Sequence, residues 1–363
     1  MAATRQDEVS RSDSAVIDCD VHQTWASESE FARYLPEGFR DRGLTPPGGP
    51  NWHNPIAAHG LGRLDAVPED GSPPGSDYDL LAEQLFEEFG VDRAVLTGPL
   101  VRDALACHPN VHYATAASEA YNDWLIAEWL DRDDRFLGGL SVAPGDADHA
   151  VEEIDRVGDH DRMAQVMMPS AHRSPYGDRQ YWPIFEAAED AGLPVGIHVN
   201  TAIGVASAPA TGAGMPLSYM EKHTVGPAAT MGQLCSMVLE GVFEEFPDLT
   251  VVFVEQRLSW IPDVMWHMDK LWKGLKDSAP WLERKPSEYV RENVRFSTQP
   301  MFEPEKPGHL AAMFEMVHAD ETVVFSTDYP HWDNDNPGAT LDALDRDTRR
   351  RVLSGNAREI YGL

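Results

Sequence analysis

Short apolar runs alternate with longer amphipathic stretches along almost the whole chain. The short runs are rich in valine, isoleucine and phenylalanine, which is typical of buried strands. The longer stretches carry apolar residues three and four positions apart, which is typical of helices that cover a sheet. We expect strands at residues 16–21, 94–96, 136–142, 164–168, 195–198, 251–254, 294–297 and 323–326. We expect helices at residues 78–89, 111–130, 147–157, 181–191, 228–246, 261–275 and 309–317, with a short extra one at 286–291.

This alternation favours an α/β fold in which parallel strands close into a single (β/α)8 TIM barrel. The length of 363 residues suits one such barrel with insertions. An open, doubly wound sheet is the alternative, and it usually has a glycine-rich turn after its first strand. Here the first strand runs instead into Asp20-Val-His22-Gln-Thr, so we prefer the barrel.

Three segments interrupt the alternation. Residues 1–14 are polar, and we expect them to be disordered, which leaves 15–363 as one barrel domain. A long insertion of about residues 23–77, rich in glycine and proline, follows the first strand. Residues 199–226 follow the fifth strand and are rich in glycine and alanine, as a substrate loop or lid would be. Both extra loops would lie at the C-terminal face of the barrel, where active sites of such barrels lie.

Charge and cysteine content exclude several classes of protein. Sixty acidic residues against 29 basic ones give a formal net charge of −31. Such a surface repels nucleic acids and anionic lipids, and no apolar run is long enough to cross a bilayer. The cysteines Cys19, Cys107 and Cys235 are far apart and form no CxxC pair, so neither a disulfide framework nor a zinc knuckle is expected. We therefore expect a cytoplasmic protein that binds neither nucleic acid nor membranes.

The same excess of acidic residues indicates adaptation to high salt. An acidic surface of this density repels itself unless salt screens its charges. We predict a halophilic protein whose melting temperature rises between low salt and molar KCl; an ordinary acidic enzyme from a GC-rich genome is the alternative. Thermal unfolding measured across that range of KCl checks the prediction. A melting temperature that stays constant would contradict halophilic adaptation.

Polar side chains follow the C-terminal ends of several expected strands. Alternate residues of a strand share a face, so Asp20 and His22 point the same way. His198 ends the fifth strand, Glu255 follows the sixth and Asp328 follows the eighth. Taken singly, His198 could be a core residue and Asp328 a helix N-cap. A closed barrel would bring all five to one mouth, and imidazoles with carboxylates are ligands for a divalent cation. The pattern therefore predicts a metal-dependent enzyme.

Five motifs, in order along the chain, resemble those of the amidohydrolase superfamily. They are Ile17-Asp-Cys-Asp-Val-His22, Gly192-Leu-Pro-Val-Gly-Ile-His198, Phe253-Val-Glu-Gln-Arg-Leu-Ser-Trp-Ile-Pro262, Ser326-Thr-Asp-Tyr-Pro-His331 and Gly355-Asn-Ala-Arg-Glu-Ile-Tyr-Gly362. The resemblance covers nearly the whole chain. It is strongest to the amidohydrolase-related branch that includes aminocarboxymuconate-semialdehyde decarboxylase. It implies a metal-dependent barrel enzyme that acts on a small molecule, and it implies a homodimer.

The resemblance implies that Asp20, His22, His198 and Asp328 bind the metal. The chain departs from the family pattern at three places. Asp20 replaces the first histidine of strand one, Glu255 replaces a strand-six histidine that is catalytic in the decarboxylases, and the strand-four lysine that bridges two metals in some members is absent. Two imidazoles and two carboxylates make a harder site than the histidine-rich version, so manganese or iron becomes more plausible there, although zinc stays our first expectation. We expect one ion, although Glu255 could bridge to a second.

Further polar residues near the strand ends are candidates for substrate binding. His172 and Arg173 follow strand four and could hold a substrate carboxylate, a group that arginine binds well. Arg257 could do the same or could pair with Glu255, whose burial without a partner would be costly. His331 lies three residues after Asp328 and could contact the substrate or support the metal ligands.

Our first hypothesis for the function is a metal-dependent hydrolase of a small, cyclic or aromatic carbonyl or carboxylate compound. The metal would lower the pKa of its bound water toward about 7. Asp328 would take the water proton and pass it to the leaving group, while Glu255 would complete the coordination or act as a base. The alternative is a metal-dependent non-oxidative decarboxylase of the same family, which the missing strand-six histidine disfavours. A binding protein on a decayed barrel is a third possibility, and the retained ligands argue against it.

Overall fold

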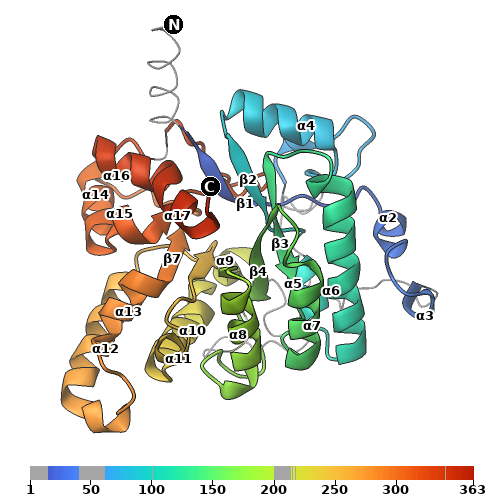
Figure 1. Cartoon of the computed structure of the whole chain (residues 1–363). Helices are drawn as coiled ribbons and strands as arrows, with labels where there is room; N and C mark the ends of the chain where they lie inside the picture. Colours follow the sequence, from blue (N-terminus) through green and yellow to red (C-terminus); the bar gives the residue numbers. More distant parts are fainter. Residues whose placement is uncertain are drawn as a thin grey trace, which may run out of the picture.

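Eight parallel strands form one sheet in which each strand pairs with its neighbours in chain order (Figure 1). The computed structural model describes residues 15–40, 62–99, 101–199, 214, 216, 218–339 and 341–363. The strands are β1 (Ile17–Val21), β2 (Arg93–Leu96), β3 (Phe136–Ser141), β4 (Met163–Pro169), β5 (Val195–His198), β6 (Val251–Val254), β7 (Val294–Ser297) and β8 (Val323–Val324).

The sheet closes because the segment that follows β8 bonds to β1. The amide of Cys19 donates to the Phe325 carbonyl at 2.9 Å, and the amide of His22 donates to the Tyr329 carbonyl at 2.7 Å. Val21 and Tyr329 form a parallel bridge. The strands therefore make a (β/α)8 barrel, as the sequence predicts. Strand β8 itself is shorter than the expected 323–326, because beyond Val324 the chain pairs irregularly with β1.

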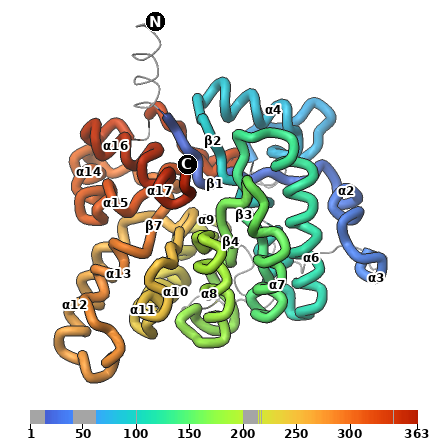
Figure 2. The backbone as a smooth tube through the Cα atoms, in the orientation of Figure 1, coloured from blue at the N-terminus to red at the C-terminus, as the bar shows by residue number. Residues whose placement is uncertain are grey.

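Helices surround the barrel and follow the strands in chain order (Figure 2). The terminal helix α17 packs beside β1, so the two ends of the described chain meet there. The helices are α2 (Glu28–Ala32), α3 (Glu37–Arg40), α4 (Tyr78–Ala82), α5 (Val101–Ala106), α6 (Val111–Leu125), α7 (Ala147–Val157), α8 (Trp182–Asp190), α9 (Tyr219–Val225), α10 (Pro227–Leu239), α11 (Val242–Glu245), α12 (Ile261–Leu275), α13 (Pro286–Asn293), α14 (Pro307–Met316), α15 (Ala319–Thr322), α16 (Arg346–Arg350) and α17 (Asn356–Tyr361).

The long helix expected at residues 228–246 is in fact two helices, α10 and α11. Gly241 separates them with a φ of +85°, in the left-handed region that glycine adopts without strain. A Cβ at this position would lie 2.7 Å from Cδ1 of Trp281, so a larger residue would also clash. The helical spacing of apolar residues continues across the break, which is why the sequence pattern alone does not reveal it.

A register shift in β1 sets the direction of the first two candidate ligands. Ile17 and Cys19 pack with Val252 and Val254 of β6 across the barrel interior. The pairing of β1 with β2 then shifts between Asp18 and Val21, and Val21 joins the outer core against the helices. Such a bulge re-aims the side chains that follow it. As a result, Asp20 and His22 face inward at the mouth of the barrel.

The expected loops are described only in part. Residues 1–14, for which we expect disorder, and residues 41–61 of the insertion lie outside the described residues. Most of the expected lid at 199–226 does too, but its end forms the helix α9, which the sequence pattern did not predict. Among the described helices, none combines the length and apolar character that a membrane span requires.

Candidate metal centre

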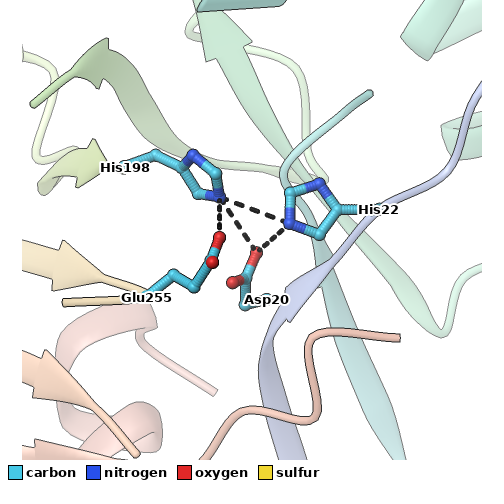
Figure 3. Close-up of side chains that lie close together, drawn as sticks. All are labelled: Asp20, His22, His198 and Glu255. Atoms are coloured by element: carbon cyan, nitrogen blue, oxygen red, sulfur yellow. Dashed lines mark hydrogen bonds and ion pairs between the residues drawn. The ribbon is translucent and has the colours of Figure 1, made fainter. Parts of the chain in front are cut away.

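Four side chains from three strand ends converge at the C-terminal mouth of the barrel (Figure 3). Nε2 of His22 lies 3.3 Å from Oδ1 of Asp20 and 3.3 Å from Nε2 of His198. Nε2 of His198 lies 3.5 Å from Oε2 of Glu255. One ligand atom from each of the four lies within 4.8 Å of every other, and the four side chains are buried or nearly so. The structure thus brings together residues that are up to 235 positions apart in the chain.

Asp328 and His331 extend this cluster from the segment after β8. Oδ1 of Asp328 lies 3.1 Å from Nε2 of His22 and accepts a hydrogen bond of 2.6 Å from Nδ1 of His331. The rings of His22 and His331 are stacked obliquely, with centroids 4.3 Å apart. His22, Glu255, Asp328 and His331 form a second group of possible ligands that overlaps the first.

The tautomers of the two central histidines are fixed by their outer hydrogen bonds. Nδ1 of His22 donates to the carbonyl of Gly98 at 2.6 Å, and Nδ1 of His198 donates to the carbonyl of Val199 at 2.9 Å. A carbonyl oxygen can only accept, so each Nε2 is left with a lone pair directed at the cluster. Two such lone pairs 3.3 Å apart repel each other unless a proton or a cation lies between them.

The carboxylates show the same electrostatic conflict. Oδ2 of Asp20 and Oε2 of Glu255 are buried and accept no hydrogen bond. Burial raises the pKa of Glu255, and the negative charges of Asp328 and Asp20 raise it further. Burial alone would lower the pKa of His22, but Asp20 and Asp328 outweigh it and raise that pKa. A divalent cation touching these atoms would relieve both conflicts and displace the protons, so the donor set fits such an ion.

Backbone strain coincides with the cluster. Glu255 has a φ of +58° and Asp328 a φ of +63°, in the left-handed region that non-glycine residues rarely adopt. Each such residue costs on the order of 1–3 kcal/mol, and such strain concentrates at functional sites. Glu255 follows β6 directly, and Asp328 lies four residues beyond the end of β8. At both positions the strained backbone accompanies a carboxylate that faces the histidines.

Comparison with known proteins settles the family. A family model described as amidohydrolase matches residues 17–363, which is nearly the whole chain. The chain belongs to this amidohydrolase family. The resemblance of its motifs to the branch of aminocarboxymuconate-semialdehyde decarboxylase is thereby confirmed, together with the barrel fold. In this chain the candidate ligands lie at or just beyond the C-terminal ends of β1, β5, β6 and β8, in the motifs that resemble those of the family.

Several relatives of this amidohydrolase are decarboxylases. The gamma-resorcylate decarboxylase of Rhizobium sp. (strain MTP-10005) is 24% identical over 296 residues, which cover 77% of this chain and 86% of the relative. The 2-amino-3-carboxymuconate-6-semialdehyde decarboxylase of Dictyostelium discoideum is 24% identical over 254 residues, covering 67% of this chain and 65% of the relative.

Solved structures share the fold over most of the chain. An amidohydrolase from Mycobacterium avium subsp. paratuberculosis K-10 superposes with a TM-score of 0.71 at 22% identity, covering 96% of this chain and 99% of that one. A dihydroxybenzoic acid decarboxylase from Polaromonas sp. JS666, solved with bound manganese and the inhibitor 2-nitroresorcinol, superposes with a TM-score of 0.66 at 18% identity. It covers 96% of this chain and 97% of that one.

The amidohydrolase cluster has supporting residues that the sequence analysis missed. Thr97, directly after β2, donates to Oδ1 of Asp20 at 2.6 Å. Asp103 on α5 lies with Oδ2 3.1 Å from Nδ1 of His198, and Arg102 binds the other oxygen of Asp103 at 2.6 Å. Such partners orient the ligands of a metal and raise their basicity. The only sequence signal for Thr97, Arg102 and Asp103 is their position after the end of a strand. The sequence pattern predicts no helix in this region.

Of the residues expected to bind substrate, only His331 lies in the cluster. His172 is buried and pairs with the hydroxyl of Tyr181 at 2.8 Å, and burial together with the charge of Arg173 lowers its pKa to about 4. Arg173 is exposed. Arg257 donates to the carbonyls of His223 and Thr224 at the end of α9, and among the described residues no ion pair joins it to Glu255. Substrate binding by His172, Arg173 and Arg257 stays a prediction.

Proposed function

We propose that this amidohydrolase is a metal-dependent, non-oxidative decarboxylase of a hydroxylated aromatic carboxylate. The observation that carries the proposal is the match to gamma-resorcylate decarboxylase, which extends over 77% of this chain and 86% of the relative. The cluster supports it, because buried carboxylates and imidazoles that converge on one point suit a cation that binds substrate oxygens.

Asp20, His22, His198 and Asp328 would hold the metal, with Glu255 as a further ligand or as a base. The fit rests on the paired Nε2 lone pairs and on the oxygens of Asp20 and Glu255 that accept no hydrogen bond from the described residues. The zinc favoured by the sequence has no specific support, whereas a relative of the same fold was solved with manganese. We therefore propose manganese first. When bound, the cation would withdraw electron density from the substrate oxygens.

Decarboxylation needs a proton for the ring carbon that loses its carboxylate. The carbon–carbon bond breaks, its electron pair forms the new carbon–hydrogen bond, and neutral CO2 leaves. The hydrogen-bonded pair of Asp328 and His331 can hold that proton at the mouth of the barrel, because Nδ1 of His331 lies 2.6 Å from Oδ1 of Asp328. This pair would replace the strand-six histidine whose loss made decarboxylation the less favoured hypothesis.

The hydrolase that we preferred from the sequence is therefore the second candidate. The sequence favours the hydrolase because Glu255 stands where decarboxylases of the family carry a histidine. In the structure the Glu255 carboxylate lies 3.5 Å from His198, where it could serve as a base for water. The relatives support the opposite order, since the decarboxylases among them match most of this chain. We give the residue type at position 255 less weight than the similarity to decarboxylases over most of the barrel.

One assay separates the two candidates. Manganese-loaded enzyme is incubated with gamma-resorcylate, salicylate and hydroxylated aromatic dicarboxylates on one side, and with aryl esters and lactones on the other. We expect CO2 release from the carboxylates, with one solvent deuterium incorporated at the vacated ring carbon in D2O. Cleavage of the esters or lactones with 18O incorporation from labelled water, and no CO2 from any carboxylate, would instead establish the hydrolase.

Four expectations from the sequence remain proposals beside this function. We propose a small-molecule substrate and a homodimer, in line with the family, and a cytoplasmic location. The barrel at 15–363 is proposed to act as a single domain, because its strands form one sheet. Gel filtration with light scattering measures the number of chains, and a monomer at working concentration would remove the dimer from the proposal.

A further inference from the structure

Asp18 is a buried carboxylate on β1, two residues before the proposed metal ligand Asp20. Its side chain is 0% exposed. Its oxygens accept hydrogen bonds from Thr327 and from the amide of Asp20, and among the described residues no cationic side chain pairs with it. A carboxylate is costly to bury without a cation beside it. Its position therefore calls for a specific role.

Thr327 is the main partner of Asp18. The amide of Thr327 donates to Oδ1 of Asp18 at 2.9 Å, and its hydroxyl donates to Oδ2 at 2.5 Å. The same hydroxyl accepts a hydrogen bond of 3.0 Å from the amide of Tyr329. Thr327 and Tyr329 flank Asp328, so the chain on both sides of this proposed ligand is tied to one carboxylate.

Asp18 also fixes the ligand that β1 contributes. Its Oδ1 accepts from the amide of Asp20 at 3.1 Å, and the amide of Asp328 donates to the carbonyl of Asp20 at 3.1 Å. Strand β8 ends at Val324, so the regular pairing of the sheet does not extend to Asp328. The carboxylate of Asp18 instead joins the segment after β8 to β1 beside both ligands.

We propose that Asp18 and Thr327 are positioning residues that hold Asp328 in the orientation from which it binds the cation. This inference rests on the proposed metal centre. Asp328 has a φ of +63°, and such a conformation persists only where the surrounding structure enforces it. The bonds from Asp18 to Thr327, and from Thr327 to Tyr329, supply that constraint. Without them, the backbone of Asp328 should relax and its carboxylate should leave the cluster.

The test is a manganese titration of chelator-treated, full-length protein, together with thermal unfolding of the metal-free form. Thr327→Val removes the hydroxyl and keeps the shape of the side chain. We expect this variant to bind manganese about 10- to 100-fold more weakly than wild type, the range found for residues that orient metal ligands. Thr327→Ser restores the hydroxyl and should bind manganese like wild type. A Thr327→Val variant with wild-type affinity would overturn the proposal.

The same substitution in an Asp328→Ala background separates positioning from a general loosening of the barrel. If Thr327 acts through Asp328, adding Thr327→Val to Asp328→Ala should weaken manganese binding by less than about twofold. An undiminished loss in that background would overturn the proposal, because it would show that Thr327 supports the whole site.

Asp18→Ala tests the other partner of the bond. It should weaken manganese binding at least as much as Thr327→Val, and the two substitutions together should be no worse than Asp18→Ala alone. Additive losses would contradict a role of Asp18 through Thr327. Should Asp18→Ala fail to fold, the threonine variants decide, because the hydroxyl that they change bonds to Asp18 and to Tyr329.

Asp92→Asn is the matched control. Oδ2 of Asp92 accepts from the amide of Val16 at 2.8 Å, so it too is a carboxylate bonded to the backbone beside β1, but at the opposite end of the strand. Its replacement should leave manganese affinity unchanged, and an equal loss in this variant would overturn the proposal.

The outcome is independent of turnover. Manganese binding that depends on Thr327, in an enzyme that releases no CO2, would support the positioning role and refute the decarboxylase. Wild-type protein that binds no manganese would refute the metal centre and the positioning role together.

Discussion

Replacing Asp328 with asparagine is expected to lower kcat by about 10³-fold or more, the range in which a positioned acid or base contributes. The amide cannot carry a proton to the substrate, and it is a poorer metal ligand than a carboxylate. Burial alone would raise the pKa of Asp328, but His331 and His22 outweigh it and hold that pKa below its usual value. The Asp328 carboxylate therefore interacts electrostatically with both histidines, and its replacement should change the electrostatic environment of both.

The decrease should be measured as initial rates of CO2 release, together with thermal unfolding. Asp328→Asn should fold, because the amide keeps the shape of the side chain, and its melting temperature should stay within a few degrees of wild type. Asp342→Asn, the same substitution at an exposed position beyond β8, is the control and should have normal rates. Near-normal turnover in Asp328→Asn would remove Asp328 from the mechanism.

Replacing His198 with alanine is expected to abolish stoichiometric metal binding. His198 is the ligand that β5 contributes, and its Nε2 contacts both His22 and Glu255. Asp103→Asn should have a smaller effect of about 10- to 100-fold in metal affinity, because Asp103 acts on the metal only through Nδ1 of His198. The difference in metal affinity between His198→Ala and Asp103→Asn distinguishes a metal ligand from the residue that orients it.

Manganese titration of chelator-treated protein, followed by elemental analysis, gives both affinities. His160→Ala is a suitable control, since this histidine pairs with Asp131 away from the cluster and should bind metal like wild type. If His198→Ala still bound one equivalent with unchanged affinity, the metal would have to lie elsewhere. If Asp103→Asn matched His198→Ala, Asp103 would be more than an orienting residue.

The ligands could be predicted from the sequence because they follow strand ends. Asp20, His198 and Glu255 each end or follow a β-branched run, and parallel strands bring their C-terminal ends to one face. The bulge in β1 could not be predicted, although the expected common direction of Asp20 and His22 is confirmed. Local alternation gave the right answer although Asp20 lies inside the shifted stretch between Asp18 and Val21.

The supporting residues could not be predicted, because no periodic pattern marks them. Helix α5 is short and almost entirely buried, so Arg102 and Asp103 look like surface residues in the sequence but form a buried pair. Helix α9 lies in a stretch rich in glycine and alanine, and Lys222 is buried only by tertiary packing. Burial of charged residues depends on long-range contacts that spacing along the chain does not encode.

The central claim is that side chains from β1, β5, β6 and β8 hold one divalent cation. Elemental analysis of full-length protein purified without chelator tests it most directly, with metal content and turnover followed together as the ion is removed and restored. We expect about one equivalent of a divalent transition metal per chain, loss of activity on its removal and recovery with manganese. Protein that turns over its substrate with no stoichiometric metal would contradict the claim.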